Sequence, residues 1–350
     1  MNTCLSVLNV AYPLAPVGMN SVGGSEQILS LIDRQLVASG HRSIVIAQQG
    51  SETAGELIPI PAREGALNSS VLAEGQRQTR DAIRSELNHR HIDVVHLHGL
   101  DFSAYIPEQD VSVLATLHLP ASWYDPGVFR LRRAKTALCC VSKSQLSTCP
   151  VSSAPMYCVP NGISVSNFLY TGQKSGYALM LTRVCPEKGV HIALEASQQA
   201  QVPLVIAGQV YGYAEHQRYF TEQVRPRLDE TRRFVGPATF AQKRKLLAGA
   251  CCLLVPSLVD ETSSLVAMEA MASGTPVIAH RRGALAELVL DGETGFLVDT
   301  VPQMAAAIRD IGSISSARCR TEAIQRFPAE KCFETYLSLY RNLAAASQAA

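Results

Sequence analysis

The order of apolar and polar segments is the feature that most restricts the fold of this chain. Short apolar runs bounded by glycine or proline alternate with segments of helical periodicity, and this pattern occurs twice in succession. Such alternation is typical of βαβ units and mostly parallel sheets. The sequence therefore predicts an α/β fold with two Rossmann-like, doubly wound domains. Their ligands are expected in a cleft between the domains, at the carboxyl ends of the strands. The apolar runs cover about residues 5–12, 42–49, 92–99, 111–118 and 136–142 in the first half, and 177–184, 202–208, 232–237, 251–257, 276–280 and 295–299 in the second.

A polar, glycine-containing stretch at residues 171–176 marks the predicted domain boundary. We therefore expect an N-terminal domain over residues 1–172 and a C-terminal domain over 173–326. The last segment, 327–350, includes Pro328 and has helical periodicity, so it is expected to be a docking helix rather than a free tail. Its apolar face comprises Cys332, Tyr336, Leu337, Tyr340 and Leu343.

Charge and cysteine content narrow the class of protein. Lysine plus arginine number 31 and aspartate plus glutamate 30, so the net charge of +1 provides no global attraction to nucleic acid or to a membrane. The ten cysteines include no Cys-x-x-Cys pair and lie mostly in apolar runs, which favours free thiols in a reducing cytoplasm over a zinc site. The N-terminus lacks the features of a signal peptide, and the longest apolar stretch, Leu247–Val259, is too short to cross about 30 Å of hydrocarbon. These observations predict a soluble, cytoplasmic protein.

Two glutamates, Glu261 and Glu269, form an E-x7-E pattern after one of the predicted strands. If the chain between them is largely helical, they are separated by about 12 Å along the helix axis. That span fits a nucleotide sugar, with one carboxylate accepting hydroxyls of the hexose and the other hydroxyls of the ribose. Between them, the backbone N–H groups of Ser263, Ser264 and Leu265 would open a helix and bind a diphosphate. In the alternative interpretation, both glutamates are solvated surface charges.

Two cations flank the loop after the first strand of the second half. Arg183 lies at the end of this strand and Lys188 at the opening of the next helix. They could neutralise a diphosphate as a metal ion would, and the sequence contains no Asp-x-Asp pair to hold such a metal. The alternative is a surface pair between these cations and Glu187.

Taken together, the motifs of this sequence resemble those of a known enzyme family. The E-x7-E and R-x4-K patterns, together with SGTPVIA, GALAEL, GGSE, DVVHLHG, VPNGI and DGETGFLV, resemble the family 4 glycosyltransferases, which are retaining enzymes of the GT-B fold. The resemblance implies a terminal helix that crosses back to the first domain. It also implies transfer of a sugar from a nucleoside-diphosphate sugar, with no metal and no cofactor beyond that co-substrate.

The resemblance also implies residue roles. His118 would hydrogen-bond the donor sugar near the reacting carbon, although a histidine at a strand end can simply be a packed residue. Gly23 and Gly24 would let the backbone approach the diphosphate or the acceptor, and the alternative for them is a turn and helix cap. The predicted site comprises the catalytic residues His118, Arg183, Lys188 and Glu261, the donor-binding residues Gly23, Gly24, Ser263, Ser264, Leu265 and Glu269, and no metal ligand.

Other features receive structural interpretations. The His96 and His98 pair is interpreted as strand-end residues near the cleft, and the basic segments 129–135 and 243–245 as solvated faces. Thr262–Ser264 replace the glycines that many similar enzymes have after the first glutamate, which narrows the space around the sugar. The segment from about residue 63 to 90, interpreted as a loop, has balanced charge and so favours a soluble acceptor.

The sequence therefore predicts a retaining, metal-independent hexosyltransferase that uses a nucleoside-diphosphate sugar, with UDP favoured, and a soluble small-molecule or saccharide acceptor. Three alternatives are a lipid-directed glycosyltransferase of cell-envelope assembly, a sugar-nucleotide epimerase and a silent sugar-nucleotide-binding protein. An NAD dehydrogenase is excluded because GMNSVGGSE does not match G-x-G-x-x-G. No nucleic-acid partner is expected, and peripheral contact with a membrane is not favoured.

Overall fold

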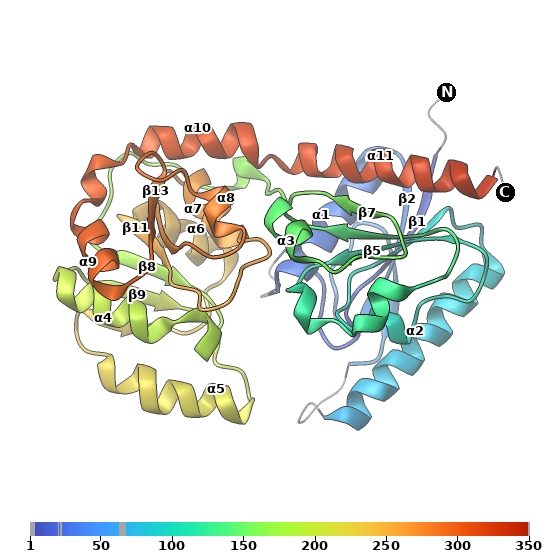
Figure 1. Ribbon diagram of the computed structural model, residues 1–350, viewed down its shortest axis with the longest axis horizontal. Helices are drawn as coiled ribbons and strands as arrows, with labels where there is room; N and C mark the ends of the chain where they lie inside the picture. The colour runs from blue at the N-terminus through green and yellow to red at the C-terminus, as the bar shows by residue number, and fades with distance from the viewer. Residues whose placement is uncertain (1–3, 20, 22, 63–67, 349–350) are drawn as a thin grey trace. The chain divides into compact units, whose positions relative to one another are not determined.

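The computed structural model describes residues 4–19, 21, 23–62 and 68–348, which form two compact units. Unit 1 comprises the chain up to Asn161 and again from Ala329, and unit 2 runs from Gly162 to Pro328. Figure 1 shows a sheet flanked by helices in each unit. The predicted boundary at residues 172–173 lies inside unit 2, where Phe168 packs into the core and the Ile163 N–H donates a 2.8 Å hydrogen bond to Phe327 O.

Unit 1 contains a seven-stranded parallel sheet. Its strands are β1 (Ser6–Val10), β2 (Arg42–Gln48), β3 (Glu56–Ile60), β4 (Val94–Leu97), β5 (Ser112–Leu117), β6 (Thr136–Cys140) and β7 (Met156–Cys158). They lie in the order β3-β2-β1-β4-β5-β6-β7. Its helices are α1 (Gly24–Ala38), α2 (Ser69–His89), α3 (Lys143–Thr148) and α11 (Ala329–Gln348).

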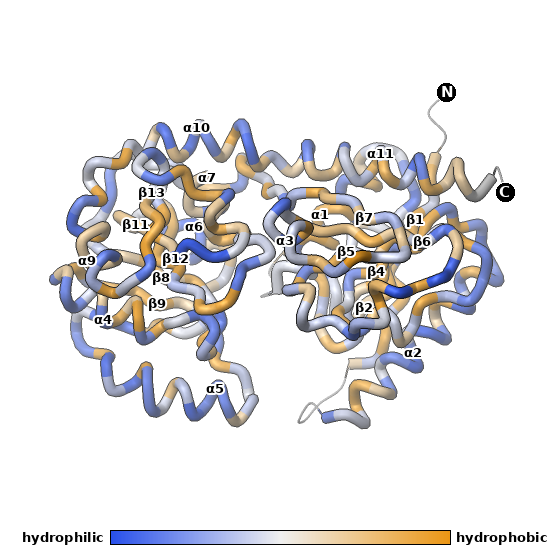
Figure 2. Tube along the Cα trace, in the orientation of Figure 1, coloured by the Kyte–Doolittle hydropathy of each residue, from blue (hydrophilic) through white to orange (hydrophobic). Residues whose placement is uncertain are grey.

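Unit 2 contains a six-stranded parallel sheet, and each of its strands coincides with a predicted apolar run. The strands are β8 (Ala178–Leu181), β9 (Leu204–Ala207), β10 (Arg232–Phe234), β11 (Cys252–Val255), β12 (Val277–His280) and β13 (Gly295–Val298), in the order β10-β9-β8-β11-β12-β13. The helices are α4 (Val190–Ala200), α5 (Ala214–Tyr219), α6 (Phe240–Gly249), α7 (Leu265–Ala272), α8 (Leu285–Leu288), α9 (Val301–Arg309) and α10 (Ser316–Arg326). In Figure 2 the apolar colour follows strands such as β11 and β13, whereas α10 is largely hydrophilic. The predicted α/β fold class is confirmed in both units.

One predicted loop in unit 1 is wrong. Residues 63–67 lie outside the described residues, but most of the rest of the predicted loop forms the helix α2. Asn68 caps this helix, since its side-chain oxygen accepts a 3.0 Å hydrogen bond from Val71 N–H. The buried residues of α2 are Gly75, Thr79, Ile83 and Glu86, which have helical spacing but include only one large apolar side chain. The sequence of α2 therefore shows almost no apolar periodicity, and for this reason the segment was interpreted as a loop.

Both sheets have a point at which the strand order reverses. In unit 1 it lies between β1 and β4, and in unit 2 between β8 and β11. Loops leaving the carboxyl ends of strands at such a point diverge and leave room for a ligand. The loops after β1, β8 and β11 carry Gly23, Lys188 and Glu261 respectively.

Helix α11 packs on unit 1, as expected for the terminal helix. Tyr336 and Tyr340 of this helix are fully buried, and Nδ1 of His96 lies 2.6 Å from the Tyr340 hydroxyl. The Ser112 hydroxyl donates a 2.8 Å hydrogen bond to Leu343 O near the end of the helix. The predicted docking of this helix on the first domain is confirmed.

Candidate active site

The loops after β8 and β11 are joined by backbone contacts in unit 2. Leu258 N–H donates a 2.8 Å hydrogen bond to Glu187 O. Gly189, which has a φ of +63°, lies against the backbone of Pro256, and a Cβ atom at this position would overlap with the Pro256 carbonyl oxygen. Only glycine permits both this approach and this backbone conformation. The R-x4-K loop therefore lies directly beside the loop that carries Glu261.

This contact brings Lys188 and Glu261 together. Lys188 belongs to the short 3₁₀ turn Pro186–Lys188, and its Nζ lies 2.5 Å from Oε1 of Glu261. The Ser257 hydroxyl donates a second hydrogen bond to the same carboxylate oxygen. The two charged side chains are only 21% and 11% exposed, so their attraction is screened less than that of a surface pair. Lys188 thus pairs with Glu261, and not with Glu187 as in the alternative interpretation.

The GALAEL segment supports the backbone of Glu261. Ala284 N–H donates a 2.7 Å hydrogen bond to Glu261 O. Gly283 has a φ of +53°, and a Cβ atom there would overlap with the same carbonyl oxygen. This glycine therefore positions the loop on which the first glutamate lies.

The helical spacing assumed for the two glutamates is wrong. Helix α7 covers only Leu265–Ala272, so Glu261 and residues 262–264 lie in the preceding loop and the estimate of 12 Å does not apply. The first helical hydrogen bond runs from Met268 N–H to Ser264 O, which leaves the N–H groups of residues 265–267 without a helical partner. Of the three residues predicted to supply N–H groups, Leu265 begins the helix, Ser264 is its N-cap, and Ser263 precedes it with a buried hydroxyl.

Glu269 is a buried residue of α7 and not a surface charge. Its side chain accepts a 2.6 Å hydrogen bond from Nζ of Lys243 on α6. Burial raises the pKa of Glu269, and the charge of Lys243 partly offsets this effect. The Lys243 ammonium also lies 5.8 Å and 5.4 Å from the ring centres of Phe168 and Phe240. The interpretation of Lys243 as part of a solvated face is therefore wrong.

The position of Lys243 on a helix could have been predicted from the residues just before it. Thr239 and Gln242 form a capping box that fixes the start of α6, so Lys243 falls in the first turn of a helix that contacts α7. Ser257 and Gly283 were also missed, because their roles depend on loops that meet only in the folded unit.

Arg183 lies two residues beyond β8 and is half-buried. Within the described part of the chain, its guanidinium forms no ion pair and no hydrogen bond. Its charge acts on the neighbouring Cys185 and Glu187 side chains and can also act on an anion at the same sheet edge.

The predicted residues of unit 1 form a separate group. His118 follows β5, and its Nε2 lies 3.0 Å from Nδ1 of His98. Burial lowers the pKa of His118 to about 3, so the ring is neutral at physiological pH. His96 is fully buried, with Nε2 2.7 Å from the Thr116 hydroxyl, and is therefore a core residue rather than a residue lining a cleft.

Gly23 and Gly24 lie at the start of α1. Gly23 is the N-cap and Gly24 the first helical residue. A Cβ atom on Gly23 would overlap with the carboxylate of Glu26, whose Oε2 accepts a 2.9 Å hydrogen bond from the Ser25 hydroxyl. This arrangement favours the turn-and-cap interpretation for Gly23, and its role in donor binding stays a prediction.

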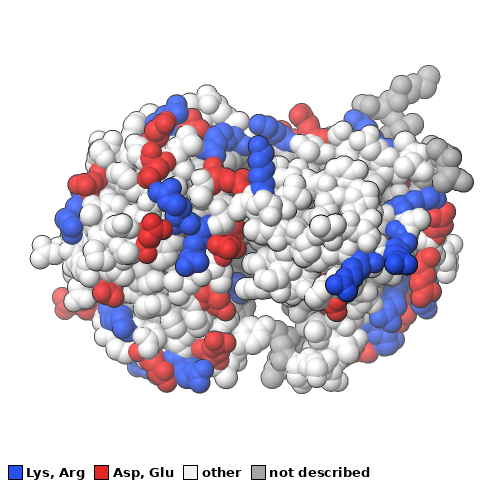
Figure 3. All heavy atoms as spheres, in the orientation of Figure 1, with Lys and Arg blue, Asp and Glu red and all other residues white. Residues whose placement is uncertain are grey.

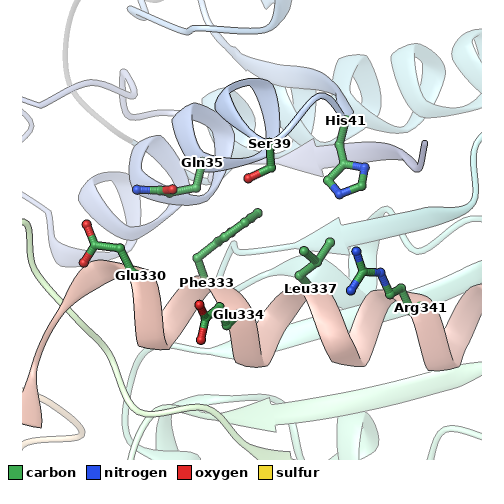
Figure 4. Close-up of a pocket in the computed structure, with 8 residues that line it drawn as sticks. All are labelled: Gln35, Ser39, His41, Glu330, Phe333, Glu334, Leu337 and Arg341. Carbon is green, nitrogen blue, oxygen red and sulfur yellow. The ribbon is translucent and has the colours of Figure 1, made fainter. Parts of the chain in front are cut away.

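Two further features do not belong to the predicted site. In the basic segment 129–135, the Arg133 guanidinium donates to the carbonyl oxygens of Pro107, Gln109 and Val111, so it holds a loop together and is not a solvated charge. A pocket between α1 and α11 is lined by side chains such as Phe333 and contains none of the predicted site residues (Figure 4).

The two parallel sheets, their switch-point loops and the positions of the two glutamates agree with the GT-B glycosyltransferase predicted from the sequence. The comparisons with known proteins agree. Residues 22–167 match the family described as Glycosyltransferase Family 4, and residues 176–313 match Glycosyl transferases group 1. The chain belongs to the family 4 glycosyltransferases.

Similar curated proteins act on sugars. Glycogen synthase of Mycobacterium tuberculosis is 26% identical over 88% of this chain and 86% of its own length. Lipopolysaccharide 1,2-N-acetylglucosaminetransferase of Salmonella typhimurium is 24% identical over 62% of this chain, which spans 56% of that protein. Phosphatidyl-myo-inositol mannosyltransferase of Mycobacterium tuberculosis is 31% identical over 43% of this chain and 42% of its own length.

Solved structures support the same fold. Sucrose-phosphate synthase from Thermosynechococcus elongatus has a TM-score of 0.79 at 20% identity, covering 97% of this chain and 100% of its own. AviGT4, a glycosyltransferase involved in avilamycin A biosynthesis, has a TM-score of 0.74 at 22% identity, covering 97% and 98%. HepE of Anabaena, in complex with UDP and glucose, has a TM-score of 0.73 at 16% identity, covering 97% and 100%. In the part of the chain that the structure describes, no helix is long and apolar enough to span a membrane.

Proposed function

We propose that the protein is a retaining, metal-independent glycosyltransferase. It transfers a hexose-like sugar from a nucleoside-diphosphate sugar, with UDP favoured as the nucleotide, to a soluble small-molecule or saccharide acceptor. The observation that carries the proposal is the Lys188–Glu261 pair at the switch point of unit 2, where a cation and a carboxylate are held side by side. One group suits a diphosphate and the other suits sugar hydroxyls.

Unit 2 offers binding groups for the diphosphate, the sugar and the ribose of the donor. Arg183, Lys188 and the first N–H groups of α7 would stabilise the diphosphate and the negative charge that develops on it as the sugar leaves. Glu261 would accept hydrogen bonds from hydroxyls of the sugar. Glu269, held by Lys243, would accept hydroxyls of the ribose. UDP is favoured as the nucleotide because HepE, which has the same fold, was solved with UDP and glucose.

In unit 1 we assign His118 to the donor sugar. Its ring is neutral, so one nitrogen can donate a hydrogen bond and the other can accept one. No cofactor beyond the sugar nucleotide is needed for this reaction. A reducing, cytoplasmic location is proposed because all ten cysteines are free thiols in the structure.

A soluble acceptor is supported by the charges on α2. Arg77 pairs with Glu74 and Asp81 at 2.7 Å and 2.9 Å, and Arg84 lies 3.9 Å from Asp81. Arg77 is therefore neutralised locally and Arg80 donates to the carbonyl oxygen of Ala104, which leaves fewer free basic side chains for binding to anionic lipid. On the face shown in Figure 3, positive and negative side chains are likewise interspersed.

A lipid-directed enzyme is the second candidate, because one relative is a phosphatidyl-myo-inositol mannosyltransferase. Sedimentation with vesicles containing anionic phospholipid separates the two candidates. The soluble-acceptor proposal expects the protein to stay in the supernatant at physiological ionic strength, and quantitative sedimentation with the vesicles would overturn it.

The donor assignment is tested with a panel of nucleotide sugars. We expect at least one UDP-sugar to raise the melting temperature, and release of UDP to depend on an acceptor fraction from cell extract. Conversion of the donor without any acceptor would indicate an epimerase. Binding without release or conversion would indicate a silent sugar-nucleotide-binding protein, and the absence of any thermal shift would contradict the whole donor site.

A further inference from the structure

Three side chains of unit 2 with metal-binding chemistry converge beside the R-x4-K loop. Cys185 and Glu187 lie in this loop, and His216 lies on α5. One ligand atom from each residue, a sulfur, an oxygen and a nitrogen, lies within 4.8 Å of the other two. None of the three has a part in the proposed transfer reaction.

Two of these residues present buried polar atoms that lack partners. Oε2 of Glu187 and Nδ1 of His216 are inaccessible to solvent and accept or donate no hydrogen bond within the described residues. A buried polar atom without a partner destabilises a fold, and such atoms are rare in native proteins. The Cys185 thiol is hydrogen-bonded to the Glu187 side chain, but these two buried atoms of the same cluster keep unused capacity to bind a ligand.

The ligand set selects the kind of ion. Thiolate sulfur, imidazole nitrogen and carboxylate oxygen are the ligands of Zn²⁺, whereas Mg²⁺ and Ca²⁺ require a shell of oxygen atoms. Tetrahedral coordination at the usual bond lengths places such ligand atoms about 3.5 Å apart. The observed spread of up to 4.8 Å therefore needs only small side-chain rotations to close around an ion.

We propose that Cys185, Glu187 and His216 bind one Zn²⁺ ion through Sγ, a carboxylate oxygen and Nδ1, with water in the fourth position. On binding, the Cys185 thiol loses its proton to solvent, so the ion, thiolate and carboxylate together are electrically neutral. The ion ties the loop that carries Arg183 and Lys188 to α5. Its role is to fix this loop, and it neither contacts the donor nor takes part in transfer.

The local electrostatics are compatible with this site. Burial raises the pKa of the Cys185 thiol to about 11, and the charges of Arg183 and Lys188 oppose this increase. The metal-free protein therefore holds a neutral thiol beside Glu187, and the ion must displace a proton to bind. This site could not be predicted from the sequence, because its ligands are of three types and do not follow a Cys-x-x-Cys spacing.

Titration of the reduced, metal-free full chain with Co²⁺ tests the proposal, since Co²⁺ takes the place of Zn²⁺ and reports a thiolate ligand by absorption in the near ultraviolet. We expect saturation at one equivalent and displacement by Zn²⁺. Cys185→Ser should abolish the thiolate band, and His216→Asn should weaken binding by about tenfold or more. The control is Cys251→Ser, which removes a half-buried cysteine of the same unit and should leave the band intact.

Several outcomes would overturn the site. They are the absence of Co²⁺ binding, a thiolate band that persists in Cys185→Ser, and a band lost in Cys251→Ser. If Cys185→Ser does not fold, His216→Asn decides alone, because its position on a short and mostly exposed helix tolerates the change. The readout is a spectrum of the protein without donor, so failure of the donor site would leave this test unaffected.

Discussion

The ammonium of Lys188 and the carboxylate of Glu261 lie 2.5 Å apart, although they come from loops that follow two different strands. Each group holds the other in place and is supported by a second contact, from Ser257 on the carboxylate side and from the Gly189–Pro256 approach on the other. A charge fixed before the donor arrives requires little reorganisation during the reaction.

Replacing the cation of this pair should slow the reaction strongly. We expect Lys188→Met to lower kcat/KM by about a hundredfold, because one preorganised charge on the leaving diphosphate is lost. The matched control is Lys245→Met on α6, where the lysine is exposed and should be dispensable. Initial rates of UDP release measure both, and equal rates in the two variants would contradict the assignment.

Substitutions of Glu261 and Glu269 should change different kinetic constants. Glu261→Gln should lower kcat, since Glu261 is assigned to the sugar near the reacting carbon, but it should not weaken binding of free UDP. Glu269→Gln should act mainly on KM and on UDP affinity, because the ribose changes little during the reaction. Kinetic titrations and calorimetry with UDP measure these effects. If Glu261→Gln weakens UDP binding as much as Glu269→Gln does, the assignment of Glu261 to the sugar and Glu269 to the ribose is wrong.

Transfer should need no metal ion at the diphosphate, so omission of Mg²⁺ and Mn²⁺ should leave the transfer rate nearly unchanged. Arg183 and Lys188 supply the positive charge that a metal would otherwise bring to the diphosphate. Rates of the Zn²⁺-loaded protein are compared with and without added Mg²⁺ or Mn²⁺, because EDTA would also remove the ion that is proposed to fix the R-x4-K loop. A strict requirement for either ion would contradict the proposed mechanism.

The product should keep the anomeric configuration of the donor. This expectation rests on membership of family 4, since the sequence offers no evident carboxylate in unit 1 to act as a base for attack from the opposite face. The coupling constant of the anomeric proton in the NMR spectrum of the product measures the configuration. Inversion would exclude a retaining reaction.

Most strands could be predicted because they are buried on both sides and therefore read as short, continuous apolar runs. Strands β3 and β7 were missed because they lie at the two edges of their sheet and most of their residues are half-buried or exposed, and β3 also contains Pro59. Helix α2 was missed because small or polar residues such as Gly75 and Thr79 occupy its buried face. These three elements lack the continuous, fully buried apolar pattern by which most of the other strands could be predicted.

The site was predictable where a residue lies in the loop after a strand, as Arg183 and Lys188 do in the loop after β8. The partners of its charged groups were not predictable, because Glu261 could meet Lys188 only once the loops after β8 and β11 were placed side by side. The pairing of Glu269 with Lys243 likewise depends on packing between α6 and α7. Motif spacing located the charges but could not show which of them neutralise one another.

Acidification should destabilise unit 1 through its buried histidines. Burial holds the pKa of His98 well below 6.5 and that of His118 at about 3, so between these values the unfolded chain binds protons that the folded unit does not. Stability is therefore full above pH 6.5 and is lost as the pH falls, by up to about 1.4 kcal/mol per pH unit for each histidine.

We expect His98→Gln to make this pH dependence shallower. Urea unfolding between pH 7 and pH 5 measures the slope, and the fluorescence of Trp123, the sole tryptophan, reports on unit 1. His89→Gln, at an exposed position of α2, serves as the control and should keep the wild-type slope. An unchanged slope in His98→Gln would show that this ring is not held neutral.

The division of unit 1 into two chain segments has a consequence for synthesis on the ribosome. Unit 2 is continuous, so its sheet can close as soon as residues 162–328 have emerged. Most of unit 1 emerges before unit 2, but it lacks Tyr336 and Tyr340 of α11, which are fully buried against it, until helix α11 has been made. Unit 1 is therefore translated before unit 2 but completes its fold after it. The apolar surface of unit 1 that α11 covers stays exposed while unit 2 folds.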